Sequence, residues 1–398
     1  MRPRERSAPT AWEQFPRHPA RRSMMLSVVA AVAVAAAVAV GIALRSGDAS
    51  PTLPVGPTAA PAAGGAIADP VDPGDFNPER LPPVETTTEQ AGAGPLLPGA
   101  PDLTIIAADD TGLQLLDTDT GDMRRIAIRR PTPAALTETL FTVGDTIVVH
   151  ADIDVVVLPA GTSRPIRLAS RHRAVPTVDD DSVWVFDAPT PYVSGTASRV
   201  GLDGTVHDQI QLPAIAEPLV GTAEGLMVSA PGAVIFVSGD GQRRPVARGM
   251  AVATDGRRLA WLQCFNDMSC AVNVGTVDDP GQVRTALQPG VLPAGVFDLP
   301  IGTFSPDGRW LALPLYESRA SRGLDEVRIS IIDTATGIEA QCLDGSTVTP
   351  LDTPSAWSPD SAWLVFVSGS DVRAWRTADG RTVTIDADLR NVRALTVR

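Results

Sequence analysis

Two short stretches of related sequence constrain the fold of this chain more than any other feature. Residues 302–315 read G-T-F-S-P-D-G-R-W-L-A-L-P-L, and residues 355–367 read S-A-W-S-P-D-S-A-W-L-V-F-V. In each stretch a large aromatic residue, Phe304 or Trp357, ends one apolar run, and a second apolar run follows shortly afterwards. The residues between the runs suit a tight turn, because proline presets φ while aspartate and glycine accept the remaining dihedral angles. Both stretches therefore predict two strands joined by a turn.

This strand–turn–strand unit resembles the inner strands of TolB-like and WD40-like β-propeller blades, whose signature reads approximately F-S-P-D-G-x-x-L-A-F. A weaker copy at 251–262, A-V-A-T-D-G-R-R-L-A-W-L, has Thr254 in place of serine and lacks the proline. The resemblance implies a propeller and says little about chemistry. The residues that carry the motif are Phe304, Ser305, Pro306, Asp307 and Gly308 in the first stretch, and Trp357, Ser358, Pro359 and Asp360 in the second.

Glycines recur at similar places in a series of strand–turn–strand patterns. Their spacings are 40, 43, 37, 40, 56 and 43 residues, and a four-stranded propeller blade has a period of about 40–45 residues. Glycine suits such turns because it adopts positive φ at little cost. No stretch after Asp102 shows a helical period. The sequence therefore predicts an all-β fold, a seven-bladed propeller of four-stranded antiparallel blades over 102–398. The seven glycines are Gly121, Gly161, Gly204, Gly241, Gly281, Gly337 and Gly380.

The first predicted blade has only three strands close together in the sequence, at 103–107, 113–117 and 124–128. One further apolar stretch, 391–398, follows the seventh hairpin. We expect this C-terminal segment to supply the innermost strand of the first blade, which closes the ring and removes a long exposed edge.

The N-terminal part predicts a membrane anchor. Residues 24–44 carry no charge, and at about 1.5 Å per residue they just span a hydrocarbon core of about 30 Å. Arg17, Arg21 and Arg22 precede them, so the positive-inside rule predicts a single-pass protein of the cell membrane, with a disordered cytoplasmic tail over 1–23 and the propeller extracytoplasmic. The alternative is a cleaved signal peptide, although its apolar region would exceed the usual length of about 7–15 residues.

Residues 45–101 are rich in proline, glycine and alanine, and they predict a disordered extracytoplasmic linker because few apolar side chains recur. All 33 basic residues are arginine, so lysine-dependent catalysis by a Schiff base or a P-loop is excluded. Seven arginines and two acids lie at or before Arg45, which leaves 33 − 7 = 26 arginines against 46 − 2 = 44 acids. That acidic excess opposes nucleic-acid binding.

Two of the three cysteines are placed to pair. Cys264 and Cys270 lie in W-L-Q-C-F-N-D-M-S-C-A-V-N-V, where apolar strands flank a short polar loop. Outside the cytoplasm such a pair is expected to form a disulfide, and two reduced buried thiols are the alternative. Cys342 is expected to be a buried, apolar residue.

No catalytic, cofactor-binding or metal-binding residue is predicted. The sequence has no G-x-S-x-G, H-E-x-x-H or G-x-G-x-x-G motif. We expect His150 to end a strand and His172 to lie in an exposed loop. Acidic clusters could bind Ca²⁺ but none has EF-hand spacing, and aspartate is common in turns. These clusters are Asp109–Asp110, Asp152 with Asp154, Asp179–Asp181, and Asp278–Asp279.

The function predicted by this organisation is binding. By analogy with the family resemblance, a membrane-anchored propeller is expected to act as a binding or scaffold module for an envelope protein, a peptide or a glycan. One alternative is a hydrolase or lyase with its site in the central funnel. A second alternative is a sensor of a small ligand or of calcium.

Overall fold

The structure is a computed structural model, and the chain divides into two units, Met1–Ala68 and Asp69–Arg398. All residues that it describes belong to the second unit, so the predicted tail (1–23) and anchor (24–44) lie outside the described residues. Among the described residues no helix is long and apolar enough to cross a membrane. The described residues are 78–90, 95–97, 99, 102–109, 111–128, 139–151, 154–162, 164–170, 172–178, 181–187, 195–265, 269–279, 283–287, 301–319, 324–344, 354–389 and 391–398.

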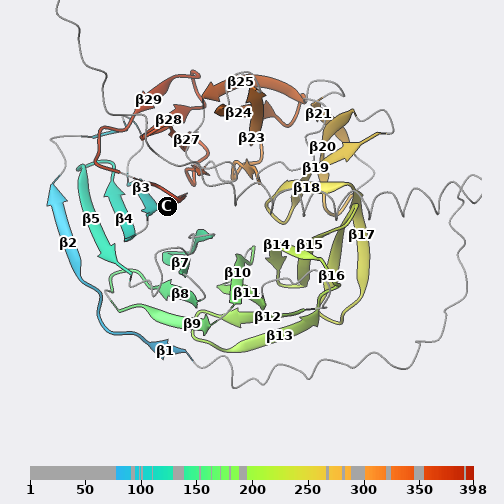
Figure 1. Ribbon diagram of the computed structural model, residues 1–398, viewed down its shortest axis with the longest axis horizontal. Coiled ribbons are helices and arrows are strands. Elements are labelled where there is room, and N and C mark those ends of the chain that lie inside the picture. The colour runs from blue at the N-terminus through green and yellow to red at the C-terminus, as the bar shows by residue number, and fades with distance from the viewer. Residues whose placement is uncertain are drawn as a thin grey trace, which may run out of the picture. The chain divides into compact units, whose positions relative to one another are not determined.

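The second unit is a ring of seven antiparallel sheets, as the sequence predicts, and each sheet is one blade (Figure 1). Counted from the ring's centre outward, blade 1 contains β30 (Ala394–Val397), β3 (Thr104–Ala108), β4 (Gly112–Asp117), β5 (Asp122–Ala127) and β2 (Thr86–Gln90). Blade 2 contains β6 (Leu140–Val143), β7 (Thr146–Ala151), β8 (Asp154–Leu158), β9 (Ile166–Ser170) and β1 (Glu79–Arg80). Blade 3 contains β10 (His172–Pro176), β11 (Ser182–Asp187), β12 (Thr196–Gly201) and β13 (Val206–Gln211).

Blades 4 to 7 each have four strands in chain order from the centre outward. Blade 4 contains β14 (Glu217–Thr222), β15 (Gly225–Ala230), β16 (Ala233–Ser238) and β17 (Arg243–Arg248). Blade 5 contains β18 (Met250–Thr254), β19 (Arg258–Cys264), β20 (Cys270–Thr276) and β21 (Arg284–Leu287). Blade 6 contains β22 (Thr303–Phe304), β23 (Trp310–Arg319), β24 (Leu324–Asp333) and β25 (Ile338–Asp344). Blade 7 contains β26 (Ser355–Trp357), β27 (Trp363–Ser368), β28 (Asp371–Arg376) and β29 (Thr382–Thr384).

Blade 1 is assembled from both ends of the described chain. Its innermost strand, β30, is antiparallel to β3, with Ile105 opposite Val397 and Ala107 opposite Leu395. The backbone N–H of Thr104 also donates to the carbonyl of Arg398 at 2.8 Å. The C-terminus therefore lies near the centre of the ring (Figure 1).

Apolar side chains fill the spaces between blades. Between blades 7 and 1, for example, Ile105, Leu395 and Val397 share one buried cluster with Val365 and Trp363. A central strand such as β27 is buried along its whole length, because each of its faces lies against a neighbouring blade. This explains why such strands read as continuous apolar runs instead of alternating ones.

The segment predicted as a disordered linker differs from that expectation in its last part. β1 pairs with β9 and β2 pairs with β5, so residues 78–90 form the outer, fifth strands of blades 2 and 1. The sequence contains prolines here and few apolar residues, and nothing local favours a strand. The strands form because the outer edges of β9 and β5 offer unpaired backbone groups.

Candidate interaction surface

The repeat motif forms a closed hydrogen-bonded turn in blade 6. The hydroxyl of Ser305 donates to the carboxylate of Asp307 at 2.6 Å and accepts the backbone N–H of Trp310 at 2.9 Å. Gly308 has a φ of 70° and donates its N–H to the Ser305 carbonyl. Ser305 is fully buried. Its hydroxyl supplies the hydrogen-bond acceptor for the Trp310 N–H within the turn.

Blade 7 repeats this arrangement. The hydroxyl of Ser358 donates to the carboxylate of Asp360 at 2.5 Å and accepts the backbone N–H of Trp363 at 2.9 Å. The aromatic residues that precede the turns, Phe304 and Trp357, are both buried. Trp357 also donates its indole N–H to the carbonyl of Thr303 in blade 6 at 3.1 Å.

The two motif turns are joined to each other and to blade 5. The backbone N–H of Asp307 donates to the hydroxyl of Ser361 at 2.9 Å. From blade 5, the guanidinium of Arg258 lies over the ring of Phe304, 5.9 Å from its centroid, and donates to the Ser305 carbonyl at 3.4 Å. The contacts of the motif therefore either close its own turn or join neighbouring blades, and they serve the structure of the ring.

The electrostatics of Asp307 agree with that role. Partial burial raises the pKa of its carboxyl, but hydrogen bonds from Ser305, Arg309 and Ser361, with the charge of Arg258, hold this pKa below its usual value. The carboxylate is thus stabilised as an anion that accepts hydrogen bonds within the turn. A general acid would require the opposite shift.

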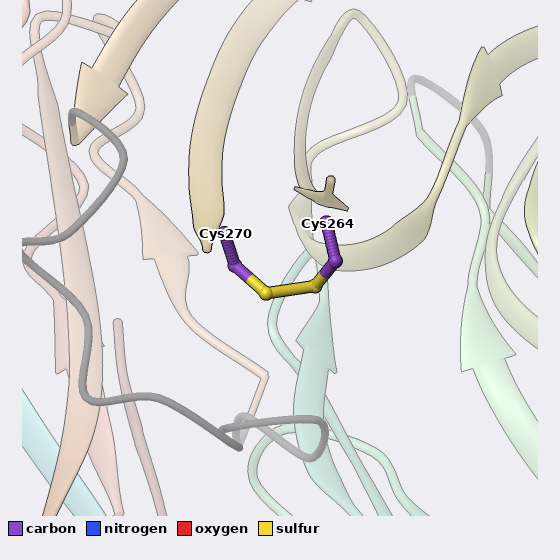
Figure 2. Close-up of a disulfide and its surroundings, with 2 residues drawn as sticks. All are labelled: Cys264 and Cys270. Carbon is purple, nitrogen blue, oxygen red and sulfur yellow. A yellow bond between two sulfur atoms is a disulfide. The ribbon is translucent and has the colours of Figure 1, made fainter. Parts of the chain in front are cut away.

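The disulfide marks one face of the ring. Cys264 ends β19 and Cys270 begins β20, and their sulfur atoms are bonded (Figure 2). In an antiparallel blade, the connection from the second to the third strand lies on the same side as the connection to the next blade. We call this side the disulfide face. The motif turns of Ser305 and Ser358 lie on the other side.

Three exposed apolar side chains lie on the disulfide face, one in each of blades 4, 5 and 6. Ile215 precedes β14, Phe265 follows β19, and Ile301 precedes β22. Their exposed fractions are 52%, 45% and 61%. Singly exposed apolar residues are common, so their shared side and neighbouring blades are the informative features.

Ile215 has an unusual backbone. Its φ is 62°, a left-handed conformation that is rare for a β-branched residue. A residue held in such a conformation costs about 1–3 kcal/mol, and such residues cluster at functional sites. Ile215 lies in a turn closed by the N–H of Ala216, which donates to the carbonyl of Pro213 at 3.2 Å, and its half-exposed side chain recovers only part of this cost through burial.

Phe265 and Ile301 adjoin the two strands that border β18, which are β19 in the same blade and β22 in the next blade. The N–H of Gly302, next to Ile301, donates to the carbonyl of Val252 in β18 at 2.6 Å. On the other side of β18, Phe265 continues β19 and donates its N–H to the carbonyl of Ser269 at 2.8 Å. The neighbouring disulfide closes this hairpin and limits the positions that Phe265 can adopt. These two residues and Ile215 are called the apolar triad below.

Two other exposed apolar residues lie elsewhere. Val283 (45% exposed) immediately precedes β21, and Ile338 (65% exposed) begins β25. Both lie at the start of the fourth strand of their blade, on the side of the ring opposite the disulfide face. They therefore supply matched positions for controls.

Several individual residues can be compared with their expected positions. His150 is buried near the end of β7, and its backbone N–H donates to the Thr139 carbonyl at 3.0 Å. His172 was expected in a loop but begins β10, where its backbone pairs with that of Asp187. Cys342 was expected to be buried but is exposed, because it lies in β25, the outermost strand of blade 6.

Two members of the predicted acidic clusters, Asp109 and Asp154, serve a turn and an ion pair. One carboxylate oxygen of Asp109 accepts the N–H groups of Thr111 and Gly112 at 2.6 and 2.9 Å. Asp154 lies 3.1 Å from the guanidinium of Arg167. Within the described ranges, His, Cys, Asp and Glu form no group of three that could hold a metal ion. Asp110, Asp152, Asp179 and Asp180 lie outside these ranges.

Sequence reasoning missed the apolar triad. Ile215 is followed by Ala216, and Ile301 is preceded by Pro300. The sequence around these two isoleucines does not distinguish them from residues of the core. Only the position of each residue just outside a strand end, on one face of the ring, distinguishes them. Phe265 gave a partial signal, since it follows a predicted disulfide cysteine directly.

No protein-family model and no curated protein matches the sequence. Solved structures that resemble the chain include AztD of Citrobacter koseri, at 12% identity and a TM-score of 0.42 over 74% of this chain and 97% of that one. A protein of unknown function from Desulfotomaculum acetoxidans has 12% identity and a TM-score of 0.48 over 75% and 98%. TolB of Acinetobacter baumannii has 15% identity and a TM-score of 0.42 over 74% and 82%. Similarity at this level adds nothing to a fold that its own strand pairing establishes as a seven-bladed β-propeller.

Proposed function

We propose that the chain is a membrane-anchored, extracytoplasmic binding module that recognises a protein or peptide of the cell envelope through the apolar triad. The observation that carries the proposal is Ile215, which is strained in its backbone and also exposed. Phe265 and Ile301 extend the apolar surface on the same face. Exposed apolar groups that share one face of the ring favour an apolar partner surface.

The extracytoplasmic location is supported by two features. Disulfides persist in oxidising compartments, and Cys264 is bonded to Cys270. The uncharged segment 24–44 supplies the expected anchor. Protease added to intact cells should remove the propeller and leave a small membrane-bound fragment. Recovery of a mature protein that begins after residue 44 would contradict an uncleaved anchor.

The chemistry of the partner follows from the net charge of the chain and from the aliphatic nature of the exposed side chains. The formal net charge of the chain is −13, which disfavours nucleic acid and anionic surfaces. Aliphatic side chains such as Ile215 and Ile301 suit an apolar protein or peptide surface better than a glycan, whose hydroxyl groups need hydrogen-bond partners. An envelope protein or peptide is therefore the favoured partner class.

Photo-crosslinking in intact cells tests this proposal. A photoreactive amino acid is placed at Phe265 or Ile301 in the full-length chain, and at Val283 or Ile338 as controls with similar exposure on the opposite side of the ring. We expect a defined protein adduct from Phe265 and Ile301 only. Equal adducts from all four positions, or none from the triad, would contradict a partner site on the disulfide face.

A further inference from the structure

Residues 78–90 cross the outside of three successive blades. β2 lies against β5 of blade 1, and β1 lies against β9 of blade 2 (Figure 1). At the N-terminal end of this segment, Pro78 packs closely against Gly204 in the turn of blade 3. A Cβ added to Gly204 would lie only 2.5 Å from the Cγ of Pro78, so no larger residue fits there. This segment is called the strap below.

Backbone hydrogen bonds and apolar contacts hold the middle of the strap. The N–H of Leu81 donates to the carbonyl of Pro165 at 3.0 Å, and the carbonyl of Glu85 accepts the N–H of Ala127 at 3.2 Å. Leu81 and Val84 are partly buried against the apolar cluster between blades 1 and 2. The strap therefore covers the outer end of one junction between blades.

An ion pair with the neighbouring strand holds each end of the strap. Glu79 is directly opposite Arg167 in the β1–β9 register, and the carboxylate lies 3.0 Å from the guanidinium. In blade 1 the carboxylate of Glu89 lies 3.6 Å from the guanidinium of Arg125. Glu79 and Glu89 thus each meet an arginine of the strand that the strap covers.

Arg125 also contacts the other end of the chain. Its guanidinium donates to the carbonyl of Asp388 at 3.1 Å and lies 3.5 Å from the Asp388 carboxylate. Asp388 lies between β29 and β30, in the segment that leads to the closing strand. One arginine on β5 therefore holds both the strap and the approach to the strand that closes the ring.

We infer that the strap is a salt-sensitive latch on the closing blade, with Glu79–Arg167 and Glu89–Arg125 as its ionic contacts. The strap pairs through short strands at exposed sheet edges, and such elements open locally at a lower free energy than the whole domain unfolds. Ion pairs between partly exposed groups are screened by salt. Salt should therefore favour the open strap while the ring itself stays closed.

Hydrogen exchange measured by mass spectrometry on the full-length chain tests the latch. Glu79→Arg and Glu89→Arg each reverse the charge of one contact, and Glu85→Arg is the matched control, because Glu85 contributes its backbone carbonyl to the strap. At low salt we expect exchange in the strap to become about two- to tenfold faster in the first two variants, as expected for exposed ion pairs. The control should match the natural sequence.

Salt separates the latch from a general loss of stability. In about 0.5 M NaCl, where the Debye length falls to about 4–5 Å, the natural sequence should exchange in the strap nearly as fast as the variants. Blades 4 to 6 should be unaffected throughout. Strap exchange in Glu79→Arg and Glu89→Arg equal to that of Glu85→Arg at low salt, or equally faster exchange in all blades, would overturn the inference.

Discussion

The backbone N–H of Asp307 donates to the hydroxyl of Ser361 across 2.9 Å, so the motif turns of blades 6 and 7 form one hydrogen-bonded unit. Ser361 is buried and has a φ of 62°. The turn that holds it is itself fixed by Ser358, Asp360 and Trp363. The two copies of the motif therefore contact each other directly, through Ser361, which stands where the first copy has Gly308.

Replacement of Ser361 by alanine removes this hydrogen bond and leaves the backbone as it was. We expect a loss in the free energy of unfolding of about 0.5–1.5 kcal/mol, the usual net value of one hydrogen bond. Urea unfolding of Ser361→Ala measures it. Ser370→Ala, at an exposed serine whose hydroxyl donates to the carboxylate of the adjacent Asp371 at 3.2 Å, is the control and should change stability little. Equal effects of the two substitutions would contradict the linkage between turns.

Replacement of Ile215 by glycine is expected to raise stability and to weaken binding. Glycine adopts positive φ without the strain of a β-branched side chain, so Ile215→Gly should raise the free energy of unfolding by about 1 kcal/mol. The same substitution should weaken capture of the partner that crosslinks at Phe265. A thermal melt and a binding assay on one preparation test both statements. Lower stability with unchanged capture would contradict the role assigned to Ile215.

The disulfide predicts a specific pattern of thiol reactivity. Non-reducing peptide mapping should find Cys264 joined to Cys270, while Cys342, which is exposed in β25, should react with a thiol reagent in the folded protein. Loss of so short a loop should cost no more than about 2–3 kcal/mol. Alkylation of all three cysteines without reductant would remove the support for an oxidising compartment.

Ring closure predicts a large effect of a small truncation. Deletion of residues 391–398 removes β30, including the buried Leu395 and Val397, and burial of each such side chain is worth about 1.5–3 kcal/mol. The truncated protein should aggregate or melt well below the intact one. Deletion of 46–68, outside the compact unit that contains the propeller, is the control. A normal melt after the C-terminal deletion would contradict closure by β30.

The sequence predicted the parts of the fold that depend on local chemistry. The turn residues around Ser305 and Ser358 identify blades because proline, aspartate and serine act within a few residues of one another. Closure by 391–398 was also predictable, since the first blade lacked one strand. The glycines of the outer hairpins have positive φ wherever the structure describes them, from Gly121 (75°) to Gly380 (69°).

The features that the sequence did not predict depend on distant partners. Residues 78–90 form strands only because β5 and β9 present open edges. No sequence pattern within 78–90 shows that such an edge lies beside them. The exposure of Cys342 follows from its place in an outermost strand, which the letters E-A-Q-C-L-D do not show. The apolar triad required the direction of three strands to be known before its members could be placed on one face.

The most direct test of the account is quantitative capture of the crosslinked partner by two double variants of the full-length chain. Phe265→Ser with Ile301→Ser alters the disulfide face, and Val283→Ser with Ile338→Ser removes equally exposed apolar groups from the opposite side. Thermal melts establish that both variants are folded. The account predicts at least about a tenfold loss of affinity, or 1.4 kcal/mol, for the first variant and unchanged affinity for the second. Unchanged binding by the first variant, or equal losses by both, would contradict a binding site on the disulfide face.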